Sequence, residues 1–234
     1  MSAPGSDARD DVMAAIRRSL GVTGAEAPRR SAVDARLAAA PRGIVPARGQ
    51  LDPGGRVALF RRMAEAASAT VAEVDGADAV PGEIARFLRD HNLPATVRTG
   101  EDPRLAAMPW GTTALEVTRG RSLGQDPNAV SHALGAVAES GTLALVSGPD
   151  NPTTLNFLPE THVVVVAAED VAGDYETILD RVRAAAGKGR MPRTLNFITG
   201  PSRSADIEQK LVLGAHGPRR LHIVVVKPCA HPAS

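Results

Sequence analysis

A short polar segment near the C-terminus carries residue types that suit an anionic ligand. Gly200-Pro201-Ser202-Arg203-Ser204 follows an apolar run that ends at Thr199 and precedes a predicted helix over 205–213. The first amides of a helix lack intrahelical acceptors and lie at its positive end, so they can bind a phosphate or carboxylate. An alternative is that Ser204 only caps the helix. The predicted anion site comprises Gly200, Pro201, Ser202, Arg203, Ser204 and Asp206.

A second polar segment, Glu139-Ser140-Gly141-Thr142, lies where two strand-like runs meet. A carboxylate at this position could act as a base, as a nucleophile or as a hydrogen-bond acceptor for a ligand. Ser140, Gly141 and Thr142 would add ligand contacts beside it. The alternative is ordinary turn chemistry, in which Gly141 supplies a positive φ angle to a hairpin or bulge.

Histidines supply the remaining candidates for chemistry. His216 lies between small residues before the last strand, where it could bind an anion or transfer a proton. His162 starts another strand and could project near the same edge, or be a satisfied core histidine. Asn156 belongs to a polar loop that could form a pocket wall. No pair at metal-ligand spacing supports a site built from Glu139, His162, Asp206 and His216, so we expect no metal.

The elements that must position these residues alternate between helix and strand from Gly55 onward. This pattern predicts βαβ units, a largely parallel central sheet and a three-layer α/β fold, with the loop after Thr199 at the carboxyl ends of the strands. The β-branched runs HVVVV and HIVVV favour strands covered on both faces. Residues 1–54 are expected to form an amphipathic helix at 10–20 and an irregular arm rich in Pro, Gly and Arg, and residues 55–234 the α/β domain.

Composition narrows the functional classes. The chain has 234 residues, 43% of them hydrophobic, and a net charge of +1, which gives no electrostatic case for nucleic acid or an anionic membrane. The single cysteine, Cys229, cannot hold a zinc knuckle or a cysteine-ligated iron–sulfur cluster within one chain. No run has the length of a membrane span and no signal core is evident, so a cytoplasmic location is expected.

Four ordered motifs resemble the lactate-utilisation protein C family, whose domain is the LUD domain. They are AVAESGTLALVSGP, LPETHVVVV, TGPSRSADIE and GAHGPRRLHIVVV. The resemblance implies an α/β fold related to the formyltetrahydrofolate cyclo-ligase and CoA-transferase group. It also implies a role in bacterial oxidation of L-lactate to pyruvate, beside operon partners that carry iron–sulfur clusters. Leu134 departs from the acidic residue that related sequences often have there.

Three hypotheses follow for the activity. The chain is a subunit of a cytoplasmic lactate-oxidising system, with Glu139 and His216 as catalytic candidates and the anion at the amides of 202–205. Alternatively, it is a stand-alone cyclo-ligase-like or acyl-transferring enzyme that binds a nucleotide or CoA ester. The third hypothesis is a non-catalytic scaffold, in which the motifs serve packing and turns. The sequence carries no flavin or nicotinamide fingerprint, so no cofactor is expected in this chain.

Overall fold

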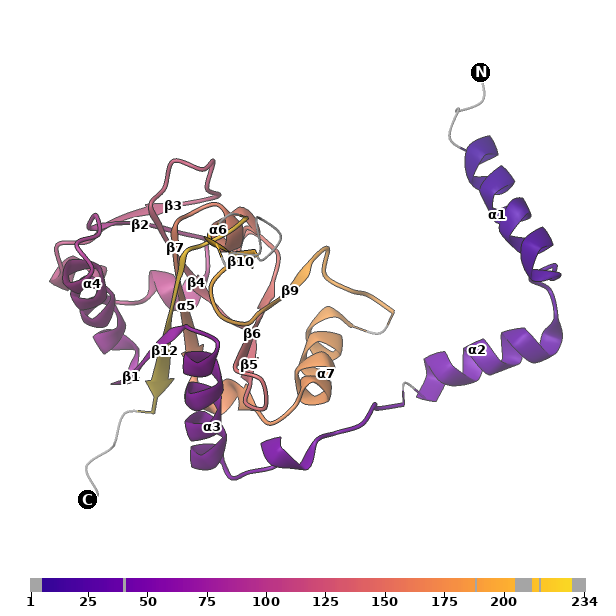
Figure 1. Ribbon diagram of the computed structural model, residues 1–234, viewed down its shortest axis with the longest axis horizontal. Coiled ribbons are helices and arrows are strands. Elements are labelled where there is room, and N and C mark those ends of the chain that lie inside the picture. Colours follow the sequence, from indigo (N-terminus) through magenta and orange to yellow (C-terminus); the bar gives the residue numbers. More distant parts are fainter. Residues whose placement is uncertain (1–5, 40, 188, 205–211, 215, 229–234) are drawn as a thin grey trace. The chain divides into compact units, whose positions relative to one another are not determined.

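The computed structural model describes residues 6–39, 41–187, 189–204, 212–214 and 216–228. For Ser6, Asp7, Ser204, Val212 and Leu213 it describes the backbone only. The chain divides into two units, Met1–Ile44 and Val45–Ser234. Figure 1 gives the course of the chain through the elements of each unit.

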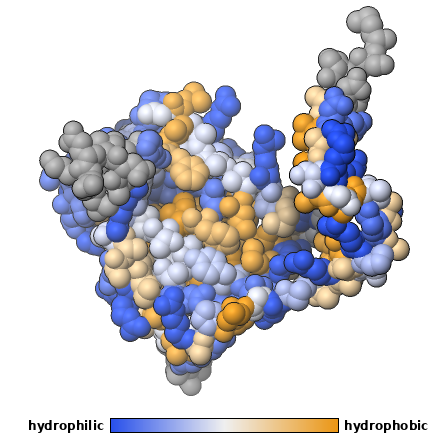
Figure 2. Space-filling model, turned by 45° about the vertical axis from the view of Figure 1, so that its right-hand side comes forward, coloured by the Kyte–Doolittle hydropathy of each residue, from blue (hydrophilic) through white to orange (hydrophobic). Residues whose placement is uncertain are grey.

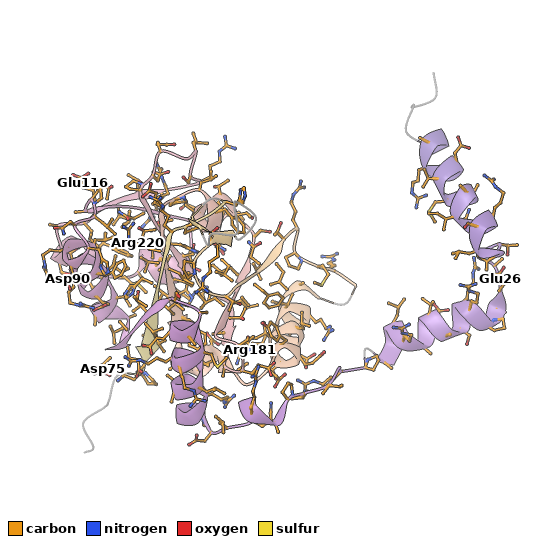
Figure 3. All side chains as sticks on the ribbon, in the orientation of Figure 1. Glu26, Asp75, Asp90, Glu116, Arg181 and Arg220 are labelled. Carbon is orange, nitrogen blue, oxygen red and sulfur yellow. The ribbon has the colours of Figure 1, made fainter. Side chains whose placement is uncertain are left out.

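The first unit contains two helices, α1 (Ser6–Leu20) and α2 (Ala27–Ala39). Between them the carboxylate of Glu26, labelled in Figure 3, accepts hydrogen bonds from the amides of Thr23 and Gly24 at 2.6 and 3.0 Å. These bonds lower the pKa of Glu26 to about 2. The sequence predicted an irregular arm over 27–39, and this prediction is wrong because these residues form α2. Alanine and arginine, both strong helix formers, dominate this segment. Apolar and charged residues alternate on the surface of these helices (Figure 2), and their exposed apolar side chains are Val12, Ile16, Leu20, Val33 and Leu37.

The second unit is built on a six-stranded sheet of order β1-β12-β7-β4-β2-β3, in which every neighbouring pair is parallel. Its strands are β1 (Thr70–Asp75), β2 (Thr96–Thr99), β3 (Glu116–Arg119), β4 (Asn128–His132), β7 (Thr161–Ala167) and β12 (Arg220–Lys227). The alternation of helix and strand predicted this parallel sheet, and the prediction is confirmed. The central strand β7 is buried on both faces, as its β-branched run indicated.

Helices cover one face of this sheet. On that face α4 (Val80–Asp90) and α5 (Pro103–Ala106) pack Ile84, Phe87 and Leu105 against Val163 and Val165 of β7. Pro81 lies in the first turn of α4, as predicted, where its missing amide hydrogen leaves no helical bond unmade. Short 3-10 turns, η2 (Ala77–Ala79) and η3 (Trp110–Thr112), connect the elements on this side.

The other face packs against a second sheet of four strands and against α3 (Pro53–Ala66). The second sheet has the order β8-β5-β6-β9, and its strands are β5 (Gly135–Val137), β6 (Thr142–Val146), β8 (Val171–Ala172) and β9 (Leu195–Ile198). The helix α7 (Tyr175–Ala186) packs Ile178 on the outer face of this sheet. Arg181, labelled in Figure 3, fixes α7 by donating to the backbone carbonyl of Asp170 at 2.8 Å. The remaining turns are η1 (Ala47–Gly49), α6 (Thr154–Phe157) and η4 (Ala168–Asp170).

Two predictions around Thr199 need correction. The strand before it, β9, pairs antiparallel with β6 in the second sheet, so it is not a parallel strand of the main sheet. Arg203–Ser204 forms a strand, β10, that pairs antiparallel with β11 (Val212–Leu213), where a helix start and a helix end were expected. The rest of the predicted helix, 205–211, lies outside the described residues.

Candidate functional site

A cavity of about 280 Å³ opens between the loop that follows β9 and the loop that precedes β12. One wall comes from α6 and the other from the end of β9 and the Gly200–Arg203 segment, while His162 of β7 and Leu221 of β12 come from the main sheet. The described lining residues are Asn156, Phe157, His162, Phe197, Ile198, Thr199, Gly200, Pro201, Ser202, Arg203, His216, Gly217, Pro218 and Leu221.

The cavity lies at the opposite end of the main sheet from the one predicted. His162 and Leu221 are each the second residue of a parallel strand, so the cavity adjoins the amino ends of β7 and β12. The rule that ligands lie outside the carboxyl ends applies to parallel strands, and β9, whose end forms the wall, is antiparallel to its neighbour. The loop after Thr199 does line a cavity, but for a different topological reason.

The Gly200–Arg203 wall is fixed by backbone contacts. Gly200 has a φ of +70°, and a Cβ atom there would lie 2.2 Å from the carbonyl oxygen of Ala67, so this position requires glycine. The amide of Ser202 donates to the carbonyl of Pro218 at 2.9 Å, and the carbonyl of Ser202 accepts from the amide of Gly214 at 2.9 Å. The prediction that the Ser202 amide is free to bind an anion is therefore wrong.

Positive charge at the cavity comes from the side chain of Arg203. Arg203 lines it, is exposed, and donates one N–H to the carbonyl of Ala67. His216 also lines the cavity and is exposed. The described lining contains no carboxylate, so its electrostatics favour an anion over a cation. Asp206 lies outside the described residues, and only the backbone of Ser204 is described.

A chain of buried polar side chains lies behind the cavity. Nε2 of His162 is 3.0 Å from the hydroxyl of Ser131, and that hydroxyl donates to Oδ1 of Asn156 at 3.3 Å. All three side chains are 1% exposed. Among the described residues, neither Nδ1 of His162 nor Nδ2 of Asn156 has a hydrogen-bond partner. Complete burial lowers the pKa of His162 to about 3, so the ring is neutral at physiological pH.

The hairpin between β5 and β6 is a cluster of hydroxyl groups. The hydroxyls of Ser140 and Thr142 lie 2.8 Å apart, and each is 2.9 Å from that of Tyr175. Thr142 is also 2.6 Å from the hydroxyl of Thr199, which lines the cavity. Because these hydroxyls hydrogen-bond to one another, the described contacts of Ser140 and Thr142 indicate a structural role.

Gly141 confirms the turn chemistry that its sequence context indicated. Its φ is +67°, and a Cβ atom there would lie 2.3 Å from the backbone nitrogen of Ala64. The hairpin therefore approaches the α3 backbone as closely as it does because position 141 has no side chain. This contact joins the second sheet to α3.

Glu139 lies apart from the cavity. It is 5% exposed and absent from the described lining, and its nearest described cation is Nε of Arg48, 3.9 Å away. Its Oε2 has no hydrogen-bond partner among the described residues. The structure thus brings together Gly200, Pro201, Ser202, Arg203 and His216 from the predicted site, but not Glu139. A catalytic role for Glu139 or His216 stays a prediction.

Sequence reasoning considered His162 and Asn156 without including them in the site, and it missed Ser131. The signal for His162 was its place at the start of a buried strand. Ser131 gave no comparable signal because its contact with His162 depends on the register of β4 against β7, in which Ala129 pairs with His162. Leu134 is half-buried, and its amide donates to the carbonyl of Ala144 at 2.9 Å.

The arrangement can hold a small polar anion. At about 30 Å³ per water, the cavity has room for roughly nine water molecules. A second hollow of about 580 Å³ shares Phe157, His216 and Gly217 with it and adds Arg219. Within the described ranges, no group of three or more His, Cys, Asp or Glu side chains is placed to hold a metal ion. No helix in the described part of the chain is long and apolar enough to cross a membrane.

Comparison with known proteins adds family evidence. The model of the LUD domain matches residues 57–226. "Lactate utilization protein C" of Geobacillus sp. strain WCH70 is 41% identical over 91 residues, and the protein of the same name in Bacillus subtilis strain 168 is 37% identical over 91 residues. Each alignment covers 38% of this chain and 38% of the relative, so less than two fifths of either protein is compared.

A solved structure supports the fold. The crystal structure of a DUF162 family protein from Deinococcus radiodurans matches with a TM-score of 0.58 and 24% sequence identity, covering 75% of this chain and 99% of that one. At this identity the likeness concerns the architecture alone. The family model, by contrast, spans well over half of the chain and nearly all of its α/β unit. This chain therefore belongs to the LUD domain family.

Proposed function

We propose that this protein is a component of a bacterial lactate-utilisation system and that its cavity binds a small carboxylate. Family membership and the relatives named lactate utilization protein C support the process. The observation that carries the ligand class is the cavity itself, whose described lining has Arg203 and His216 but no carboxylate. Its volume of about 280 Å³ suits a small acid better than a nucleotide.

Further parts of the proposal concern the setting. The protein works in the cytoplasm beside iron–sulfur proteins, which carry the electrons removed from lactate. The chain has one cysteine, so a cysteine-ligated cluster belongs to another subunit. Glu139 and His216 are the first candidates for acid–base roles, and His216 has the stronger case because it lines the cavity.

Deletion of the gene tests the process, and complementation tests the cavity. We expect loss of growth on L-lactate, rescue by the native gene, and poor rescue by Arg203→Glu, which places a negative charge at the cavity. Arg190→Glu is the matched control because Arg190 is exposed and is not among the described residues lining the cavity. Normal growth of the deletion strain refutes the process. Full rescue by Arg203→Glu favours a scaffold role.

A second candidate is a stand-alone enzyme that binds a nucleotide or CoA ester. The size of the adjoining hollow, which both Arg219 and Glu160 line, favours it, because a longer ligand could extend from the cavity past His216. A thermal-shift screen separates the two, since a ligand that binds only the folded state raises the melting temperature with its concentration. A shift with L-lactate and none with nucleotides or CoA esters supports the first candidate, and the reverse supports the second.

A further inference from the structure

Three side chains form a continuous buried relay behind the cavity. Asn156 and His162 line the cavity, and Ser131 lies between them, 3.3 Å from Oδ1 of Asn156 and 3.0 Å from Nε2 of His162. Ser131 is not among the described lining residues, so its hydroxyl links the two outer groups instead of contacting a ligand. Asn156 belongs to α6, Ser131 to β4 and His162 to β7, so strands and a helix turn hold all three.

The single proton of the Ser131 hydroxyl gives the relay a direction. When it donates to Oδ1 of Asn156, the Nε2–H of His162 donates to Ser131, which leaves Nδ1 of His162 as an acceptor and Nδ2 of Asn156 as a donor. With the amide flipped and the relay reversed, Nδ1–H becomes the free donor and the amide oxygen the free acceptor. Either direction presents one unused donor and one unused acceptor.

The two outer groups of the relay are buried without partners, as are several other side-chain atoms of the described residues, but these two belong to residues that line the cavity. Both residues are 1% exposed, yet Nδ1 of His162 and Nδ2 of Asn156 have no partner among the described residues. Nearly all buried polar atoms in folded proteins are hydrogen-bonded, because an unpaired buried group destabilises the fold. His162 is neutral, since burial lowers its pKa to about 3, so its ring carries one N–H and one lone pair. Because both residues line the cavity, a ligand seated in it is a candidate partner for these atoms.

We propose that Asn156, Ser131 and His162 are the specificity-determining residues of the cavity and select an acid that carries a hydroxyl beside its carboxylate. The free donor binds a carboxylate oxygen, and the free acceptor receives the hydroxyl proton of the ligand. A 2-oxo acid or an unsubstituted acid has no such proton and leaves the acceptor unpaired. This inference rests on the proposed function, because it assigns a ligand class to the same cavity.

Binding measurements on the purified full-length protein test the selection. Isothermal titration with L-lactate, pyruvate and propionate should give a dissociation constant for lactate at least about tenfold below the other two, because sites built to bind a hydroxyl reject analogues that lack it. Ser131→Ala breaks the relay without touching the ligand, and it should bring the three constants together.

A matched variant controls for general loss of structure. Thr70→Val also removes a hydroxyl from a buried histidine, 2.8 Å from Nδ1 of His222, whose ring packs against Phe87 on the helix-covered face of the sheet. It should leave the preference for lactate unchanged. Nitrogen-15 NMR of His162 adds a readout that a purely structural role would not move. The Nδ1 resonance should shift when lactate binds.

Two results would overturn the inference. One is equal affinity for lactate and propionate, which would mean that bound water satisfies the two atoms. The other is the absence of lactate binding at millimolar concentration. Neither result touches the proposed role in lactate utilisation, which the deletion strain decides. If the deletion strain fails to grow on lactate but the protein shows no selective binding, the specificity proposal is refuted and the proposed role in lactate utilisation is supported.

Discussion

Two of the buried histidines of the main sheet, His162 and His222, lie on opposite faces and are partnered differently. His222 on β12 has partners at both nitrogens, with Thr70 at 2.8 Å and Glu83 at 3.2 Å, and it stacks on Phe87 with ring centroids 4.0 Å apart. His162 on β7 lines the cavity, and among the described residues it has Ser131 as a partner at one nitrogen and none at the other. Burial alone therefore does not distinguish the two histidines, whereas their hydrogen-bond partners do.

Both rings are buried with a lowered pKa, so acidification should destabilise the protein through both of them. This is the largest effect that we expect. Burial lowers the pKa of His162 to about 3 and that of His222 to about 4, and it also lowers that of His132. Because these values lie below the unfolded value, the unfolded chain binds more protons as pH falls. Stability is thus complete above about pH 6.5 and is lost toward pH 4, by on the order of 5 kcal/mol at pH 4.5 for His162 and His222 together.

Urea denaturation over this pH range measures the effect. Replacing either histidine by leucine should reduce the slope of unfolding free energy against pH by about 1.4 kcal/mol per pH unit. A slope unchanged in both variants would mean that other groups dominate the acid response.

His222→Leu should break the structural side of the comparison. The change removes the ring stacked on Phe87 and its contact with Oε1 of Glu83, which keeps its hydrogen bond from Arg86 at 2.6 Å. We expect a loss of about 2–4 kcal/mol in unfolding free energy, because the change removes a buried stacked ring together with its two hydrogen bonds. Lactate affinity of the folded fraction should not change. A loss below about 1 kcal/mol would show that the network contributes little.

His162→Leu should break the ligand side. Leucine has a similar volume and faces Leu221 and the β-branched core, and the bond between Ser131 and Asn156 can persist. We expect a stability change below about 1.5 kcal/mol and at least a tenfold weaker binding of lactate, by about 1.4 kcal/mol. Calorimetry and urea denaturation on the same preparation separate the two quantities. A large loss of stability with intact binding would reverse the assignment of the two histidines.

Arg203→Gln should give the smallest effect. The guanidinium is exposed and already donates to the carbonyl of Ala67, so water and salt screen its attraction for a bound carboxylate. Lactate affinity should fall about two- to fivefold, consistent with the 0.2–1 kcal/mol typical of exposed ion pairs. Repeating the titration in high salt should shrink the difference. A salt-independent loss of tenfold or more would place Arg203 in direct, desolvated contact with the ligand.

Much of the fold could be predicted because its signals are local. The run 163–166 is continuously apolar and β-branched, and β7 is buried on both faces. Pro81 and the helical spacing after it predicted α4, and Gly141 predicted the hairpin. The four-stranded sheet was missed because a short apolar strand such as β9 reads the same in a parallel or an antiparallel sheet.

The candidate site was harder to predict because it depends on strand order. The Gly200–Arg203 wall and His216 were found from turn residues and from the resemblance to a known family. Which end of the main sheet they adjoin depends on β9 leaving that sheet, and no local pattern encodes this. The relay through Ser131 requires β4 to lie beside β7 in a particular register. Glu139 was grouped with the cavity because it follows a strand, yet the described lining does not include it.

The cavity has walls from both layers of β-structure, with His162 and Leu221 on one side and the Phe197–Arg203 segment on the other. A molecule bound there would contact both sheets and hold them together reversibly. Hydrogen exchange in β9 and in β7 should then slow together as the ligand concentration rises, because either sheet can open only after the ligand dissociates. The availability of the small acid would in this way set how often the protein opens.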